Sequence, residues 1–176
     1  MKGESPQPDE ALAAGLRGFG PTGIFAILVI LLGNLLFLPL SAILVLVWAR
    51  WSSTPWREIG YVRPANWVRT VVVGVVFGVA GKFAMKAVVM PLMGADPVNQ
   101  AYHYLAGNRA ALPGAIYLMI VAAGFGEETV FRGFLFERLG RMFGSGRRAR
   151  AAIVLITSML FSAAHYSVQG LAGSEQ

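Results

Sequence analysis

The sequence contains no cysteine, and only two of its 176 residues are histidines. Disulfides, thiolate zinc sites and cysteine nucleophiles are therefore excluded. Two histidines are also too few for a metal site built from several imidazoles of one chain. We expect a protein without a metal or any other cofactor.

Charge is scarce as well. Only 14% of the residues are charged, against about 25% in a soluble domain, while 56% are hydrophobic and the mean hydropathy is +0.59. Such a chain would expose apolar surface everywhere unless lipid were its solvent. The composition predicts an all-α, multi-pass bundle of transmembrane helices with membrane lipid as its first partner.

The net charge of +6 and the pI near 10.2 could suggest nucleic acid as a partner. However, the basic residues lie between the apolar runs and not on one amphipathic face. Anionic lipid and membrane topology explain this distribution better, so no nucleic-acid partner is expected.

About four apolar runs reach the length of roughly 20 residues that crosses a bilayer. The first, 22–49, has no charged residue and predicts one transmembrane helix with a kink at Pro39. Residues 1–21 carry prolines and mixed charges, which predicts a polar, mobile N-terminal tail before a transmembrane domain at 22–176. The other predicted spans are 68–93, 113–136 and 151–170.

Basic residues predict the orientation. With four spans, the first and third loops share one side and carry nine arginines, whereas the other side carries Lys2, Arg17 and Arg109. The excess predicts a protein of the cell membrane with cytoplasmic arginine-rich loops and an outer N-terminus.

Two glutamates and an arginine lie inside the third run, where each charge near the bilayer centre costs roughly 2.5–3.5 kcal/mol. Glu128 and Arg132 are four residues apart, so an ion pair on one helix face is expected. From Glu127 the same spacing leads to Phe131 and not to a cation, which favours Glu127 as a general base. Two other interpretations stay open: the three groups join helices, or they carry protons or cations.

His165 is the only histidine within a predicted span. At 1.5 Å per residue, Glu127 lies roughly 16 Å in from Arg138 and His165 roughly 22 Å in from Arg150. The two side chains can therefore meet near mid-membrane. A carboxylate base beside an imidazole, in a cavity shielded from water, can activate a water molecule and stabilise an oxyanion. Amide hydrolysis is a suitable reaction class.

The run Glu127-Glu128-x-x-x-Arg132, followed by Phe161-x-x-x-His165, resembles the CPBP family of intramembrane peptidases. That family includes the CAAX prenyl endopeptidases and bacteriocin-processing proteins. Gly133, directly after the arginine, also fits, and the resemblance covers about residues 111–172.

The resemblance implies a peptidase-like helix bundle around a conical cavity, with a peptide or protein substrate that can carry a prenyl group. By position, Glu127 matches the base that activates water, and Glu128 and Arg132 match its supporting pair. His165 matches the first histidine of the oxyanion site. Phe131 and Phe161 are expected to line the substrate cavity. The family was once described as metal-dependent, but no metal is expected here.

Members of that family normally continue through further helices that carry a second histidine and an asparagine, whereas this sequence ends at Gln176. We therefore expect a C-terminally truncated or degenerate member, which can lack activity. The alternatives are a non-catalytic membrane partner or immunity-type relative of the same fold, and a small transporter using Lys82, Lys86 and the glutamates.

Overall fold

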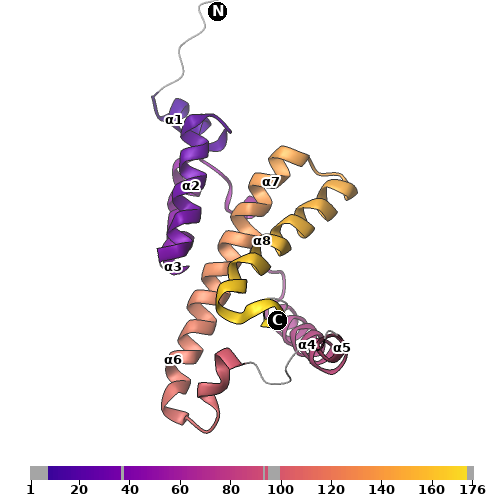
Figure 1. Cartoon of the computed structure of the whole chain (residues 1–176). Coiled ribbons are helices and arrows are strands. Elements are labelled where there is room, and N and C mark those ends of the chain that lie inside the picture. The colour runs from indigo at the N-terminus through magenta and orange to yellow at the C-terminus, as the bar shows by residue number, and fades with distance from the viewer. Residues whose placement is uncertain (1–7, 37, 93, 95–99, 174–176) are drawn as a thin grey trace, which may run out of the picture. The chain divides into compact units, whose positions relative to one another are not determined.

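The computed structural model describes residues 8–36, 38–92, 94 and 100–173, and these residues form helices and turns without a strand (Figure 1). Three of the described helices are long and apolar enough to cross a membrane, and a bent pair of shorter helices makes a possible fourth. The predicted all-α, multi-pass architecture is confirmed. The three long helices are Trp67–Leu92, Arg109–Phe143 and Arg147–Tyr166.

The chain divides into two compact units. Unit 1 comprises Met1–Tyr61 and Gly114–Ile153, and unit 2 comprises Val62–Pro113 and Val154–Gln176. Unit 1 is built from α1 (Pro8–Arg17), α2 (Pro21–Leu36), α3 (Leu38–Trp51), the short helix η1 (Trp56–Ile59), most of α6 (Leu112–Tyr117), η5 (Leu118–Phe134), α7 (Leu135–Phe143) and the start of α8 (Arg147–Gly173).

The first apolar run does not form one kinked helix, so that prediction is wrong. The Ser41 hydroxyl donates to the Ile30 carbonyl, although 11 residues of continuous helix would hold these groups far apart. A methyl group on Gly33 would lie 3.0 Å from Leu44, which shows how closely the two helices approach. The chain therefore reverses, and α2 and α3 lie side by side as a hairpin (Figure 1). Pro39 occupies the first turn of α3, where its missing N–H costs nothing.

The expected polar tail is also corrected. Residues 8–17 form α1, and only residues 1–7 of the predicted tail lie outside the described part of the chain. Leu16 is buried, and its carbonyl accepts a hydrogen bond of 3.0 Å from the Trp48 indole N–H. Prolines and charges outweigh the few apolar residues in the composition of this segment, so hydropathy alone does not predict this helix.

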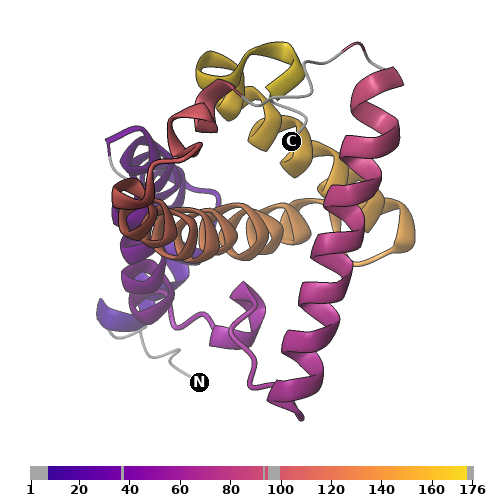
Figure 2. The same cartoon turned by 90° about the horizontal axis from the view of Figure 1, so that it is seen from below.

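A long helical rod supports unit 1. It runs without interruption through α6, η5 and α7 (Figure 2). The segment η5 is a π-helix, a wider helix in which the backbone hydrogen bonds reach five residues back: the Leu135 N–H donates to the Val130 carbonyl. Such wide turns are rare in proteins, usually occur as single turns, and are frequent at functional sites. Here they extend over 17 residues that include both glutamates.

The core of unit 1 lies between α3 and this rod. The rod contributes two fully buried side chains, Phe134 and Val130, and α3 contributes Val45. The rings of Trp48 and Phe134 meet edge to face at 4.9 Å. Burial of this aromatic pair fixes α3 against η5 at a position C-terminal to the two glutamates.

One end of unit 1 is held by charged side chains. Glu137 and Arg138 have side chains only 3% exposed and form a two-pronged ion pair, with Nε–Oε2 at 2.6 Å. Arg138 also donates to the Arg17 carbonyl at 2.9 Å. Arg141 pairs with Glu137 and, at 3.1 Å, with Glu58. This cluster, hereafter the charge cluster, joins α1, η1 and α7.

The charge cluster corrects the predicted orientation. Arg17 was placed with the N-terminus on one side of the membrane, and Arg138 with the cytoplasmic loops on the other. Their hydrogen bond and the 3.4 Å contact of Arg17 with Glu58 put both at the same end of unit 1. The predicted placement of the two on opposite sides is therefore wrong, because the two residues are in direct contact.

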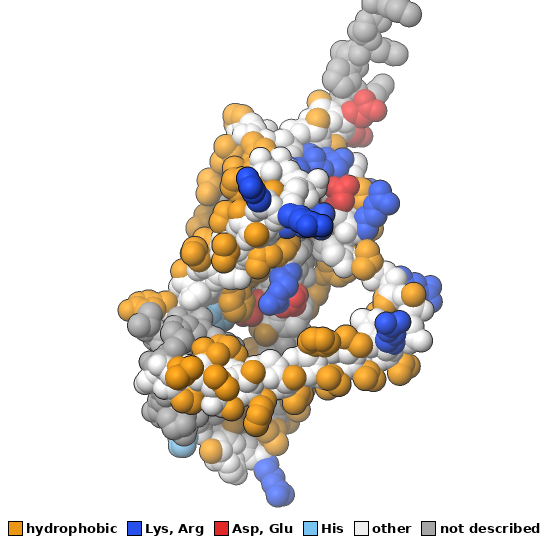
Figure 3. All heavy atoms as spheres, turned by 90° about the vertical axis from the view of Figure 1, so that its right-hand side faces the viewer, with side chains coloured by type: hydrophobic (Ala, Val, Ile, Leu, Met, Phe, Trp, Pro, Cys, Tyr) orange, Lys and Arg blue, Asp and Glu red, His pale blue; other side chains and the backbone are white. Residues whose placement is uncertain are grey.

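Unit 2 contains α4 (Trp67–Ala84), a wide turn at Met85–Val89, α5 (Met90–Leu92), the short helices η3 (Gln100–Leu105) and η4 (Arg109–Ala111), and most of α8. The Asn66 side chain caps α4 by accepting from the Arg69 N–H at 2.9 Å. No residue of α4 is buried. Hydrophobic side chains cover much of the surface seen in Figure 3, as expected for a protein whose solvent is lipid.

Candidate active site

The predicted ion pair between Glu128 and Arg132 is present in η5. The carboxylate and the guanidinium meet across one turn of the helix, as their spacing predicts. The Glu128 side chain is 49% exposed and that of Arg132 is 66% exposed. The pair therefore lies on the surface of the rod, where an apolar surrounding would make separation of the two charges costly.

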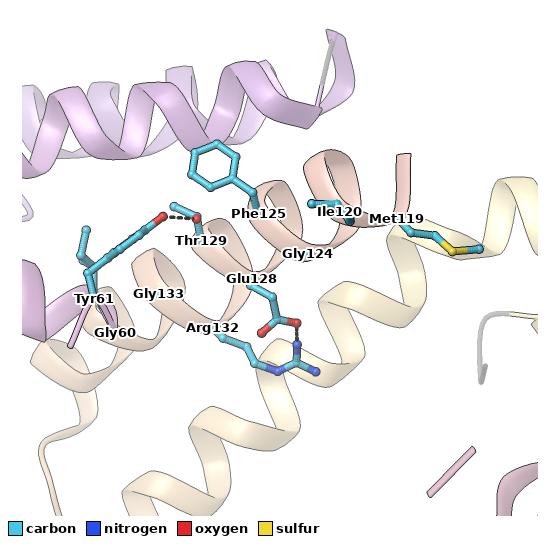
Figure 4. A pocket seen from close by; sticks show the side chains of 11 residues that line it. Gly60, Tyr61, Met119, Ile120, Gly124, Phe125, Glu128, Thr129, Arg132 and Gly133 are labelled. Carbon is cyan, nitrogen blue, oxygen red and sulfur yellow. Dashed lines mark hydrogen bonds and ion pairs between the residues drawn. The ribbon is translucent and has the colours of Figure 1, made fainter. Parts of the chain in front are cut away.

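A groove of about 700 Å³ runs past this pair (Figure 4). Glu128 and Arg132 supply its charged wall, and most of the remaining wall is apolar. All of the lining residues belong to unit 1: Ile59, Gly60, Tyr61, Met119, Ile120, Gly124, Phe125, Glu128, Thr129, Arg132 and Gly133. A groove of this kind suits an extended peptide or a chain with apolar groups.

Gly133 allows the floor of the groove to form. A methyl group on Gly133 would lie 2.8 Å from the Ile59 carbonyl oxygen, which belongs to the backbone of η1. Only a residue without Cβ permits this approach. The glycine that follows the arginine in the motif thus has a packing role, because it brings η1 against η5.

Tyr61 reaches the site from the same segment. Its hydroxyl hydrogen-bonds the Thr129 hydroxyl at 2.7 Å, one residue along from Glu128 (Figure 4). No sequence motif indicated Tyr61, Thr129 or Phe125 as lining residues. The relevant signal is spatial, because η1 and η5 are separated by more than 50 residues in the chain.

Glu127 and Phe131 face away from this groove. Glu127 is half-buried, Phe131 is 8% exposed, and neither is among the lining residues. Phe131 was expected to line the substrate cavity, but it is buried and does not line this groove. The groove contains the supporting pair of the motif, and the proposed base lies on another side of the helix.

Phe161 and His165 lie one turn apart on α8, in unit 2. The His165 Nδ1 is 2.9 Å from the Phe161 carbonyl oxygen, which can only accept, so Nδ1 carries the proton. The two rings also stack at 4.3 Å. In the neutral ring, Nε2 is then a hydrogen-bond acceptor. These contacts fix the orientation of the imidazole.

The structure thus groups the predicted residues in two sets. The first set lies on η5 in unit 1 and comprises Glu127, Glu128, Phe131 and Arg132. The second set lies on α8 in unit 2 and comprises Phe161 and His165. The predicted meeting of Glu127 and His165 stays a prediction. Among the described residues there is no group of three or more His, Cys, Asp or Glu side chains that could hold a metal.

Comparison with known proteins identifies one family. The family model of type II CAAX prenyl endopeptidases, Rce1-like, matches residues 109–173. This segment contains η5 with Glu127, Glu128 and Arg132, and α8 with Phe161 and His165. No curated protein and no solved structure gives a significant match. Residues 109–173 are therefore similar to the Rce1-like CAAX prenyl endopeptidases, in agreement with the resemblance of the same segment to the CPBP peptidases.

Proposed function

We propose that this chain is an intramembrane endopeptidase that hydrolyses a peptide bond with water activated by Glu127. The observation that carries the proposal is the Glu127-Glu128-x-x-x-Arg132 run on a wide helix within the segment that matches the family. Glu128 and Arg132 form an ion pair with each other, and the neighbouring carboxylate of Glu127 is proposed as the general base.

In this proposal Glu127 accepts a proton from water as the water attacks the scissile carbonyl. The same carboxyl group then returns the proton to the departing amine, so the base is regenerated. Glu128 and Arg132 keep the helix in the conformation that presents Glu127. No metal or other cofactor takes part in any of these steps.

His165 is proposed to act at the same water. Because Nδ1–H donates to Phe161, the neutral ring offers Nε2 as an acceptor for the water's second hydrogen. Donation to an oxyanion would require the protonated ring, which then has a donor at each nitrogen. Phe161 stacks on the imidazole and keeps it oriented.

The proposed substrate is a peptide or protein segment at the membrane, either of the CAAX type, with or without a prenyl group, or a bacteriocin or leader peptide. The largely apolar groove beside Glu128 supports a substrate with apolar groups. We place the arginine-rich end of unit 1 in the cytoplasm. The N-terminal helix α1 shares that side through the charge cluster.

The test compares the cleavage of membrane-inserted CAAX and leader peptides by the wild-type chain and by Glu127→Gln, with products identified by mass spectrometry. Replacing the carboxylate by an amide removes the base but keeps the shape of the side chain. We expect a loss of at least 10²-fold in turnover with an unchanged melting temperature. Glu10→Gln, the same substitution in α1, is the matched control and should retain activity.

Unchanged turnover in a folded Glu127→Gln protein would contradict the catalytic assignment. If neither the wild-type chain nor the variant cleaves any peptide although both bind it, the observations favour a non-catalytic membrane partner of the same fold.

A further inference from the structure

The α2–α3 hairpin presents an apolar face whose large side chains are exposed. On α2 the exposed large residues recur at the spacing of one helix face, and α3 shows the same pattern. The outer stripe consists of Ile24, Phe25, Leu28, Val29, Leu32 and Leu36 on α2, and of Ile43, Val47 and Trp51 on α3.

The opposite face of the hairpin already has its partner. Ile30, Gly33, Ala42 and Val45 are buried, and α3 packs along η5. The outer stripe is therefore a second surface and does not serve the core of unit 1. There is no charged residue anywhere between Thr22 and Ala49, so the whole hairpin can enter an apolar phase.

The hairpin is short. The 16 residues of α2 extend about 24 Å and the 14 residues of α3 about 21 Å at 1.5 Å per residue. A hydrocarbon core is about 30 Å thick, and a spanning helix needs about 20 residues. Neither helix alone reaches from one water phase to the other.

The two ends of the hairpin also differ in chemistry. Its open end is next to the charge cluster and to Arg50 and Arg57, and it carries the exposed tryptophans Trp51 and Trp56. Arginine and tryptophan together are typical of the membrane–water interface. At its closed end Leu36 is 80% exposed, and no charged residue lies nearby in the chain.

We infer that the α2–α3 hairpin is a re-entrant element whose outer stripe is in contact with lipid acyl chains. It enters the bilayer from the arginine-rich end of unit 1 and returns to the same side, with its tip inside the hydrocarbon. It thus anchors unit 1 without crossing the membrane. This inference does not depend on the peptidase activity.

The absence of native cysteine allows a clean test. Leu28→Cys and Leu36→Cys on the stripe, and Ser53→Cys in the exposed turn after α3, each receive one nitroxide spin label. The full chain is reconstituted at one copy per nanodisc. Collision with dissolved oxygen, which partitions into lipid, is then compared with collision with a water-soluble nickel chelate.

We expect labels at positions 28 and 36 to collide with oxygen and to be protected from nickel, with the stronger oxygen preference at position 36. The label at position 53 should show the reverse. Nickel access at position 36 would overturn the inference, because the tip would then lie in water on either side. Protection from both reagents would also overturn it, because protein and not lipid would cover the stripe.

Discussion

At the scale of single residues, Glu127 and Glu128 are neighbours in the chain, but their carboxyl groups have different surroundings. Glu128 meets Arg132 on the surface of the rod, whereas Glu127 is half-buried and lies outside the groove. One motif can therefore combine an ion pair that stabilises the helix in lipid with a carboxylate that is proposed to act as the general base.

This separation predicts a difference in stability. Glu128→Ala and Arg132→Ala should each lower the melting temperature in detergent more than Glu127→Gln does, because each leaves one charge without its partner. The double variant should recover part of the loss, since no lone charge remains. Because the pair is about half exposed, we expect a modest coupling of about 1 kcal/mol in detergent and a larger one in bilayers. Equal melting temperatures for all four proteins would contradict the assignment.

At the scale of helices, the position of η1 determines the shape of the groove. The contact of Gly133 with the Ile59 carbonyl and the hydrogen bond of Tyr61 with Thr129 are its two attachments to η5. Glu58, in the same short helix, is held by Arg17 and Arg141. The charge cluster therefore also positions the wall of the groove.

Gly133→Ala tests this attachment. The added methyl group would meet a backbone oxygen at 2.8 Å, so η1 must shift. We expect a loss of about 1–3 kcal/mol in the free energy of unfolding, measured by thermal denaturation in detergent.

Gly140→Ala is the matched control, because nothing lies within 4 Å of the added group in α7. It should be neutral or stabilising by up to about 1 kcal/mol, since alanine favours helix. A Gly133→Ala protein as stable as Gly140→Ala would show that the close approach of η1 is not required.

The helices also show what sequence can and cannot predict. Long, predominantly apolar runs predicted three spans, because about 20 such residues are needed to cross the hydrocarbon core. The hairpin was missed because hydropathy is the same whether a chain continues or reverses. Gly33, Asn34 and Pro39 were the available signals, as turn-forming residues in an otherwise aliphatic run.

The charge cluster was missed for a different reason. Glu137 and Arg138 look like surface charges at the end of a span, and the sequence does not indicate that α1 covers them. The Glu128–Arg132 pair was predictable because both partners lie on one helix, whereas the partners in the cluster come from three elements.

At the scale of the whole molecule, the hairpin changes the orientation that the arginines predict. Arg17 lies at the same end of unit 1 as Arg138, so the number of basic residues at that end increases. The proposed function requires a base on η5 of unit 1 and an imidazole on α8 of unit 2. The central claim of the proposed function is that the Glu127 carboxylate and the His165 imidazole act on the same water.

The most direct test of that claim is a cross-link in the cysteine-free chain. Glu127→Cys is paired with His165→Cys, and in a second protein with Ala163→Cys, which lies about 200° around α8 from position 165. Both are treated in membranes with a short bifunctional thiol reagent. We predict efficient cross-linking through position 165 and little through position 163. Efficient cross-linking through position 163 and none through 165, in proteins of equal folded yield, would contradict the proposed active site.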